Sequence, residues 1–254
     1  MLSNLIAASA MLVALYLLYK LRAVHVLLYE VHDTTRTESA KNFRQLEALL
    51  GLYIELDLAG SLPATRGWAA SPDFLLELAT HALSCRPACI VECSSGTSTL
   101  VLARCAQRNG YGKVFSLEHD QHYAEQTRQQ LLRHGLSAWA EVIDAPLHQY
   151  QLDGEEWPWY RHEQLAHDAV IDMLVIDGPP QATRSMARYP AGPLLFPRLN
   201  AGAAVFLDDA ARPDELAALQ RWQAEFPQLV QSSRACEKGC TVLASAAFVG
   251  KAQA

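Results

Sequence analysis

Residues 91–100 read VECSSGTSTL: an apolar run that reaches Glu92, a turn of small hydroxylated residues around Gly96, and a second apolar run. The pattern predicts a buried strand, a tight turn and the start of a helix. A turn between a strand and a helix N-terminus can hold a ligand with its backbone N–H groups. A Ser-rich loop that binds nothing is the alternative interpretation.

Beyond this stretch, short apolar runs alternate with longer segments of helical periodicity. Five runs are predicted to be buried strands: 88–93, 113–119, 140–145, 172–178 and 203–209. Three intervening segments are predicted to be helices or helix-containing crossovers: 98–106, 121–134 and the stretch around 184–199. Strand, helix and strand in this order predict a parallel sheet with helices on both faces.

The C-terminal part has a different pattern. After a predicted helix at 213–225, two further strands at 229–235 and 241–249 are joined only by the short turn CEKGC. Such a short connection allows only an antiparallel hairpin. The sheet is therefore expected to end in an antiparallel strand.

The N-terminal segment, residues 1–23, is predicted to be a transmembrane anchor. Residues 1–19 carry no charged side chain, and a helix of that length spans roughly 28 Å, close to the hydrocarbon thickness of a bilayer. A signal peptide and a buried helix are the alternatives; the first lacks a basic n-region, and apolar residues resume at 24–29. Because Lys20 and Arg22 follow the span, the positive-inside rule predicts a single-pass protein with a cytoplasmic C-terminal domain.

The segment after the anchor is predicted to be an amphipathic helical linker, residues 24–62, with its helix at 38–56. Another helix is expected to start at Ser71, an N-cap residue followed by a proline and an acid. The rest of the chain, residues 63–254, is predicted to form one α/β domain.

Composition narrows the class of partner. The net charge is −6 and Lys and Arg do not cluster, so no nucleic-acid partner is expected. Six cysteines in 254 residues are too few for a disulfide framework, and their spacing fits a zinc site poorly. Buried, reduced thiols are expected, in agreement with a cytoplasmic domain.

Acidic residues stand where the predicted strands end. The strand-end residues are Glu92, Glu118 with His119 and Asp120, Asp144, Asp177, and Asp208 with Asp209. Ligands of open α/β sheets bind outside the carboxyl ends of the strands. These side chains are therefore predicted to surround a binding site.

The series IVECSSGTSTL, VFSLEHD, VIDAPL, DMLVIDGPP and FLDDAARP resembles the motif ladder of the class I S-adenosylmethionine-dependent methyltransferases. It is especially similar to a subgroup whose first motif reads Glu-x-Gly-Ser-Gly-x-Ser-Thr. The resemblance covers roughly residues 63–250. It implies a Rossmann-like, seven-stranded, mostly parallel sheet with an antiparallel C-terminal strand. This chain departs from the subgroup at Ser94, where glycine would allow positive φ; serine fits if its φ is ordinary.

The resemblance also implies which residues bind S-adenosylmethionine. Glu92 and the turn at 94–98 would hold the methionine part, Glu118 the ribose hydroxyls, and Asp144 with Ala145 the adenine. A carboxylate suits the ribose because it only accepts hydrogen bonds, although Glu118 could instead favour a helix N-terminus. The full predicted set is Glu92, Ser94, Ser95, Gly96, Thr97, Ser98, Glu118, His119, Asp144, Ala145 and Asp177.

Asp177 and Asp208 are the predicted catalytic residues. In one mechanism Asp177 or a neighbour is a general base for an acceptor hydroxyl or amine. In the other, Asp177, Asp208 and Asp209 hold Mg²⁺, as in metal-dependent enzymes similar to catechol O-methyltransferase, whose pattern is Asp followed by Asp-Asn. This chain has Asp209 where asparagine is usual.

The acceptor is expected to be a small molecule, a lipid or a membrane-associated compound. Residues 157–160, WPWY, either wall the acceptor site or pack under a loop, and Trp68 is a candidate cover for the cofactor. Two other functions compete with methyl transfer. A nicotinamide-dependent oxidoreductase is disfavoured because the chain lacks a GxGxxG run, and a non-catalytic scaffold stays open because of Ser94.

Overall fold

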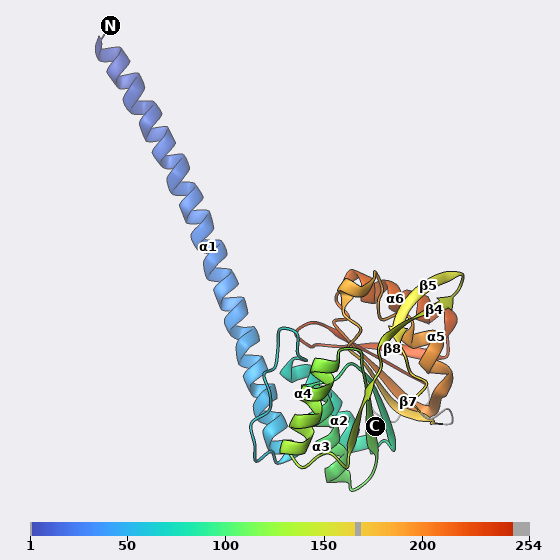
Figure 1. The fold of residues 1–254 in the computed structure, drawn as a ribbon. Helices are drawn as coiled ribbons and strands as arrows, with labels where there is room; N and C mark the ends of the chain where they lie inside the picture. The colour runs from blue at the N-terminus through green and yellow to red at the C-terminus, as the bar shows by residue number, and fades with distance from the viewer. Residues whose placement is uncertain (1, 166–168, 246–254) are drawn as a thin grey trace. The chain divides into compact units, whose positions relative to one another are not determined.

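The computed structural model describes residues 2–165 and 169–245 (Figure 1). The chain divides into two compact units, Met1–Leu46 and Glu47–Ala254. Helix α1, Leu2–Leu56, supplies the described part of the first unit and begins the second. The strand predicted at 241–249 runs past residue 245, so its last part, 246–249, lies outside the described residues.

The first unit consists of α1, whose apolar side chains between Leu2 and Val31 are exposed. Over the described residues, α1 is the one helix long and apolar enough to cross a membrane, judged by length and composition. It passes residues 23 and 24 without a break. The predicted helix at 38–56 is therefore the C-terminal part of α1 and not a separate element.

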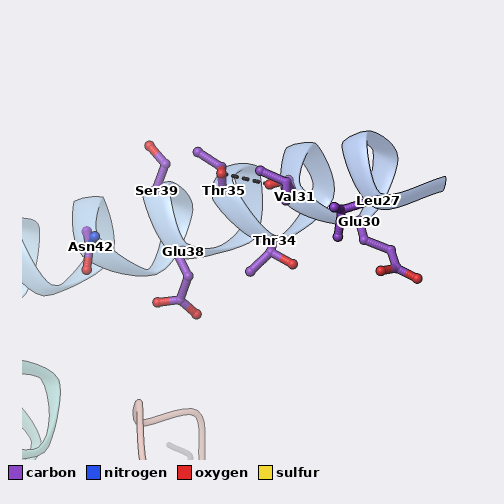
Figure 2. Close-up of a pocket in the computed structure, with 8 residues that line it drawn as sticks. All are labelled: Leu27, Glu30, Val31, Thr34, Thr35, Glu38, Ser39 and Asn42. Carbon is purple, nitrogen blue, oxygen red and sulfur yellow. Dashed lines mark hydrogen bonds between the residues drawn. The ribbon is translucent and has the colours of Figure 1, made fainter. Parts of the chain in front are cut away.

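A shallow hollow lies along α1 (Figure 2). The eight residues that line it all belong to this one helix: Leu27, Glu30, Val31, Thr34, Thr35, Glu38, Ser39 and Asn42. Ligand sites are concave and bury most of their ligand, and the surface of a single helix does not. The hollow is therefore not a candidate functional site.

The second unit is built on a seven-stranded sheet in the order β3-β2-β1-β6-β7-β9-β8. Its strands are β1 Cys89–Cys93, β2 Lys113–Glu118, β3 Ala140–Asp144, β6 Ile171–Ile176, β7 Leu199–Asp208, β8 Leu229–Arg234 and β9 Cys240–Ser245. The strands from β3 to β7 pair in parallel, whereas β9 is antiparallel to β7 and β8. The predicted, mostly parallel sheet with an antiparallel C-terminal strand is confirmed.

Helices cover both faces of the sheet (Figure 1). One core contains residues of α2 Pro72–Cys85, α3 Thr97–Asn109 and α4 Gln121–Arg133, together with the end of α1. The other core contains residues of α5 Ala191–Leu195 and α6 Pro213–Glu225. Because successive strand side chains point to opposite faces, Ile90 packs in the first core and its neighbour Val91 in the second.

A hairpin that the sequence analysis missed lies between β3 and β6. Strands β4, Leu147–Leu152, and β5, Glu155–Tyr160, form a separate two-stranded antiparallel sheet. Asp153 and Gly154 connect them with φ of 51° and 78°, as a two-residue turn of type I′ requires. The dipeptide Asp-Gly was therefore the signal that could have revealed the hairpin.

The remaining differences from the sequence analysis are local. The crossover expected around 184–199 contains only short helices, η1 Gln181–Thr183, α5 and η2 Phe196–Arg198. Ser71 occupies the N-cap position of α2 but makes no capping hydrogen bond with its side chain, whereas Asp120 caps α4 through His122 N. All six cysteines are free thiols.

Candidate functional site

The parallel sheet aligns the ends of its strands along one edge. Glu118 is in register with Asp144, Cys93 with Ile176, and Ile176 with Leu207. The residues that follow these positions therefore emerge at the same carboxyl edge, where open α/β sheets bind ligands. The strand-end residues therefore lie along one edge of the sheet, and their part in a binding site stays a prediction.

The turn after β1 carries the glycine-like backbone that the resemblance implied, although it has a serine. Ser94 has φ of 130° and Gly96 has φ of 148°. A serine with positive φ costs on the order of 1–3 kcal/mol, so the condition under which serine would fit this turn without strain, an ordinary φ, is not met. Apart from its two chain neighbours, no described residue has an atom within 4 Å of the position of an added Cβ at Gly96, which leaves open space beside the turn.

Glu92 supports this turn from within the protein. Its side chain is fully buried, and its Oε2 accepts hydrogen bonds from Thr99 (2.6 Å) and Ser116 (2.7 Å). Burial raises the pKa of Glu92, and the hydroxyl hydrogen bonds oppose that rise. The contacts show that Glu92 anchors the start of α3; direct contact with a ligand stays a prediction.

Glu118 presents a fixed, almost fully buried carboxylate at the end of β2, with 5% of its surface exposed. Its Oε2 accepts a hydrogen bond from Ser95 (2.8 Å), and its Oε1 accepts one from the backbone N–H of Asp120 (3.0 Å). His119 Nδ1 lies 3.1 Å from the same Oε1. The carboxylate therefore faces the turn after β1, and four lone-pair sites leave it capacity for further donors.

The residues predicted near the adenine lie at the end of β3. Ala145 is buried and its N–H donates to the carbonyl oxygen of Glu118 (2.7 Å). Asp144 is exposed and forms an ion pair with Arg128 (2.6 Å). Their backbone therefore adjoins the Glu118 strand end, while the Asp144 side chain is held by Arg128; their contact with a cofactor stays a prediction.

Tyr160 reaches the carboxyl edge from the β4–β5 hairpin. A Cβ added at Gly178 would lie 2.2 Å from its Oη and 3.4 Å from the Cβ of Ser94. On its other side the ring meets His119, with ring centroids 5.8 Å apart. Tyr160 therefore lies across the ends of β2, β1 and β6.

The other aromatic residues of WPWY have a different role. Trp157 and Trp159 are fully buried in the second core. Trp157 stacks with Tyr189 at 4.7 Å between centroids and lies under the guanidinium of Arg184. The tryptophans therefore pack in the core, and Tyr160 lies at the carboxyl edge of the sheet; the interpretation that this motif walls an acceptor site stays a prediction.

Trp68 belongs to a turn held by residues from far along the chain. Its side chain is 92% exposed. Lys238 Nζ donates to the carbonyl oxygens of Gly67 (2.9 Å) and Ala69 (3.1 Å), so the backbone on both sides of Trp68 is tied down. Its predicted role as a cover for the cofactor stays a prediction.

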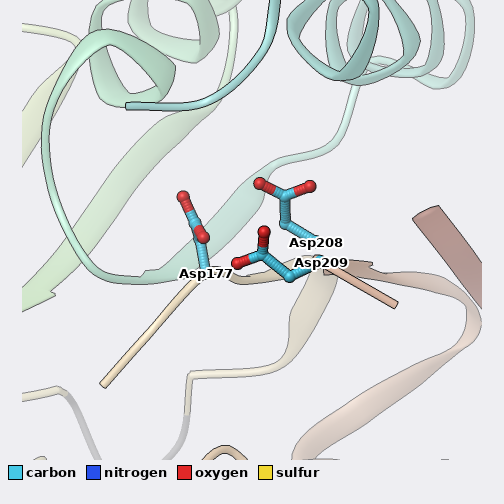
Figure 3. Close-up of side chains that lie close together, drawn as sticks. All are labelled: Asp177, Asp208 and Asp209. Atoms are coloured by element: carbon cyan, nitrogen blue, oxygen red, sulfur yellow. The ribbon is translucent and has the colours of Figure 1, made fainter. Parts of the chain in front are cut away.

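Three carboxyl groups meet at the ends of β6 and β7. Asp177, Asp208 and Asp209 each offer one oxygen, and these oxygens lie within 4.8 Å of one another (Figure 3). The predicted convergence of these three residues is confirmed. The sequence analysis considered only Mg²⁺ as a cation that these three carboxyl groups could hold.

A buried arginine, which the sequence analysis missed, occupies this cluster. Arg188 Nη2 lies 3.1 Å from Asp177 Oδ1 and 2.7 Å from Asp209 Oδ2, and Nη1 donates to the Asp208 carbonyl oxygen (2.7 Å). Arg212 adds a second guanidinium 2.9 Å from Asp209. Asp177 and Asp209 are therefore neutralised by side chains of the protein.

Burial and mutual repulsion separate the protonation states of the two predicted catalytic residues. Burial raises the pKa of Asp177 to about 6, although Arg188 opposes the rise. Burial, together with the charges of Asp177 and Asp209, raises the pKa of Asp208 to about 8. Neither carboxyl oxygen of Asp208 accepts a hydrogen bond from any residue that the structure describes. The pKa values of both carboxyl groups are therefore raised, that of Asp208 more than that of Asp177.

The fold is shared with methyltransferases of known structure that were solved with S-adenosylmethionine or S-adenosylhomocysteine bound. Residues 91–210 match a family model described as a methyltransferase domain, which supports a methyltransferase of this class. No curated protein sequence matches the chain closely enough to identify a relative.

Solved structures show the same fold at low sequence identity. Cofactor-bound Rv0187 from MTB has a TM-score of 0.53 and 20% identity, covering 80% of this chain and 89% of its own. The O-methyltransferase TomG from Streptomyces achromogenes, in complex with SAM, has a TM-score of 0.51 and 16% identity. The match covers 79% of this chain and 88% of TomG. The SAH-bound methyltransferase PaMTH1 from Podospora anserina has a TM-score of 0.51 and 16% identity. The match covers 78% of this chain and 87% of PaMTH1.

Asp208→Asn is expected to change how stability depends on pH. The native Asp208 carboxyl keeps its proton up to about pH 8, whereas its ordinary pKa is 3.8. Because the native state binds this extra proton, the contribution of Asp208 to the free energy of unfolding falls as pH rises from about 4 to about 8. The variant lacks this loss, so its stability relative to wild type should rise by up to several kcal/mol across that window.

Urea unfolding at a series of pH values measures this difference. Asp214→Asn is the control: burial raises the pKa of Asp214, but hydrogen bonds from Ser185, the Met186 backbone and Gln181 together lower it below its ordinary value. Its stability relative to wild type should fall with rising pH. A difference between Asp208→Asn and wild type that stays constant from acid to alkaline pH would contradict the assignment.

Proposed function

We propose that this chain is a membrane-anchored, S-adenosylmethionine-dependent methyltransferase that methylates an oxygen or nitrogen nucleophile. The observation that carries the proposal is the fixed carboxylate of Glu118, which faces the Ser94–Gly96 turn across the carboxyl edge of the sheet. The methyltransferase-domain match at residues 91–210 and the cofactor-bound structural neighbours support it. Membership of the subgroup with the Glu-x-Gly-Ser-Gly motif is part of the proposal.

The residues at the edge fit the cofactor. Glu118 would accept the ribose hydroxyls, and the N–H groups at the start of α3, beside the open space at Gly96, would hold its carboxylate end. His119, Asp144 and Ala145 would border the adenosine. S-adenosylmethionine supplies a methyl group on a positively charged sulfur, and buried carboxylates nearby favour that charge.

Asp177 is the proposed general base. Its side chain is 12% exposed and its pKa is about 6, so it is ionised at neutral pH and accessible. Placed near an acceptor hydroxyl or amine, it would accept the proton that leaves as the methyl group arrives. Asp208 is the proposed neutral partner, because its retained proton limits repulsion beside Asp177.

The residues of the acidic cluster fit Mg²⁺ poorly. Their oxygen donors are of the kind that Mg²⁺ prefers. However, the guanidinium of Arg188 already bridges Asp177 and Asp209, and Arg212 also reaches Asp209. We therefore derive no step of the reaction through a metal ion.

The two competing functions predict different ligands. A non-catalytic scaffold would bind no cofactor. This function stays open because the backbone at Ser94 is strained. A nicotinamide-dependent oxidoreductase would bind NADH in place of S-adenosylhomocysteine, and the methyltransferase-domain match does not favour it. Titrating the full chain in detergent with both compounds separates the three functions.

Glu118→Ala is expected to weaken S-adenosylhomocysteine binding about ten- to a hundredfold, because hydrogen bonds to a charged group contribute about 1.5–3 kcal/mol. Isothermal calorimetry on the full chain measures the change. Glu141→Ala is the matched control, since Glu141 is an exposed carboxylate on β3 paired with Lys113. Equal affinity in both variants would contradict the ribose assignment, and no binding to folded wild type would favour the scaffold.

We propose that α1 anchors the enzyme as a single-pass span, with the catalytic unit in the cytoplasm. Its length and composition allow a span, and Lys20 and Arg22 follow the apolar stretch. An anchored enzyme has ready access to acceptors in or near the bilayer. The proposed acceptor is accordingly a small molecule, a lipid or another membrane-associated compound.

Replacing Leu12 and Leu17 with arginine is expected to release the protein from membranes, because each central charge costs about 2.5–3.5 kcal/mol on the insertion scale. Carbonate washing followed by immunoblotting of pellet and supernatant measures the release. Replacing Thr34 and Thr35 with arginine, outside the predicted span, should leave the protein in the pellet. Retention of the leucine double variant would argue against a span at 1–23.

A further inference from the structure

We propose that Arg188 is the permanent cation of the acidic site and excludes a divalent metal ion from it. This role of Arg188 rests on the proposed function: if the chain is a methyltransferase, its methyl transfer needs no metal ion. It concerns a residue that neither the motifs nor the family match assigns a role. Arg188 would be a positioning residue that acts through Asp177.

The geometry places the guanidinium between the carboxylates that a metal ion would need. Nη2 contacts Asp177 Oδ1 at 3.1 Å and Asp209 Oδ2 at 2.7 Å. Mg²⁺ requires near-octahedral oxygen ligands at about 2.0–2.1 Å. A metal ion held by Asp177 and Asp209 would therefore lie against a like charge, which repels it strongly in a buried site.

Arg188 cannot easily move aside. Its side chain is 4% exposed, and it also donates to the carbonyl oxygens of Asp208 (2.7 Å) and Asp177 (3.0 Å). Glu215, on α6, forms a further ion pair with its Nε at 3.6 Å. Because guanidinium stays charged at any physiological pH, the site contains a cation under all relevant conditions.

Arg188 does not donate a hydrogen bond to the carboxyl group of Asp208. Both oxygens of its fully buried carboxyl lack a hydrogen-bond donor among the described residues, as does Asp209 Oδ1. They belong to the same cluster, in which one carboxyl oxygen of each of Asp177, Asp208 and Asp209 lies within 4.8 Å of the others. If Arg188 is removed, they and Asp177 lose the cation that bridges the cluster, although Arg212 still pairs with Asp209 Oδ2. Oxygen ligands of this kind should then take up a hard divalent cation.

The test measures Mn²⁺ binding to the full chain in detergent by the loss of the free-ion electron paramagnetic resonance signal, without S-adenosylmethionine. Wild type should bind no Mn²⁺ at this site. Arg188→Met should bind one ion per chain, at least about tenfold more tightly than wild type, and the double variant R188M/D208N should lose it. Arg188→Lys, which restores a positive charge, should bind none.

Arg212→Met is the matched control, because Arg212 also contacts Asp209 but is 40% exposed and leaves Arg188 in place. It should behave as wild type does. One Mn²⁺ per wild-type chain, lost in Asp208→Asn, would overturn the proposal, and so would a folded Arg188→Met that binds none.

Circular dichroism checks whether each variant folds. If Arg188→Met unfolds in metal-free buffer, Arg188→Gln, which keeps polar contacts without the charge, replaces it. Recovery of the folded spectrum on adding Mn²⁺ would support the proposal, and failure of both variants to fold or bind with Mn²⁺ would overturn it. Since no cofactor is present, failure here is distinct from failure to bind S-adenosylhomocysteine.

Discussion

The buried guanidinium of Arg188 joins the carboxyl ends of β6 and β7 and thereby determines the shape of the candidate site. It contacts side-chain or backbone oxygens of Asp177, Asp208 and Asp209. Without it, the carboxylates of Asp177 and Asp209, which each place an oxygen within 4.8 Å of the other, would repel in a medium that screens charge poorly. Removing one partner of such a buried network costs about 3–5 kcal/mol. The arrangement of the acidic edge therefore depends on this one side chain.

The other half of the edge is held by hydroxyl and carboxylate contacts. Glu92 ties the start of α3 to β2 through Thr99 and Ser116, and Ser95 links the turn to Glu118. These contacts hold the strained backbone at Ser94 in place. The edge thus has a hydroxyl-rich part around Glu118 and an arginine-neutralised acidic part around Asp177, with Tyr160 between them. We propose adenosine binding at the first part and proton transfer at the second.

The strands and their acidic ends could be predicted from the sequence because each apolar run stops at an acid, and parallel strands bring those ends together. Arg188 could not, because it lies in the irregular stretch between η1 and α5 and its partners come from β6, β7 and α6. Tyr160 was assigned no specific place because the Asp153–Gly154 turn was not recognised. The φ of Ser94 is set by the surrounding contacts, which no pattern of residue types records.

The most direct test of the account is a crystal structure of the full chain with S-adenosylhomocysteine. The account predicts the ribose hydroxyls on Glu118, the amino-acid end of the ligand at the Ser94–Gly96 turn, and Ser94 still at positive φ. The sulfur should lie between this turn and Asp177, with Arg188 still bridging Asp177 and Asp209. A ligand bound away from Glu118, or no bound ligand in crystals grown with S-adenosylhomocysteine in excess, would contradict the central claim.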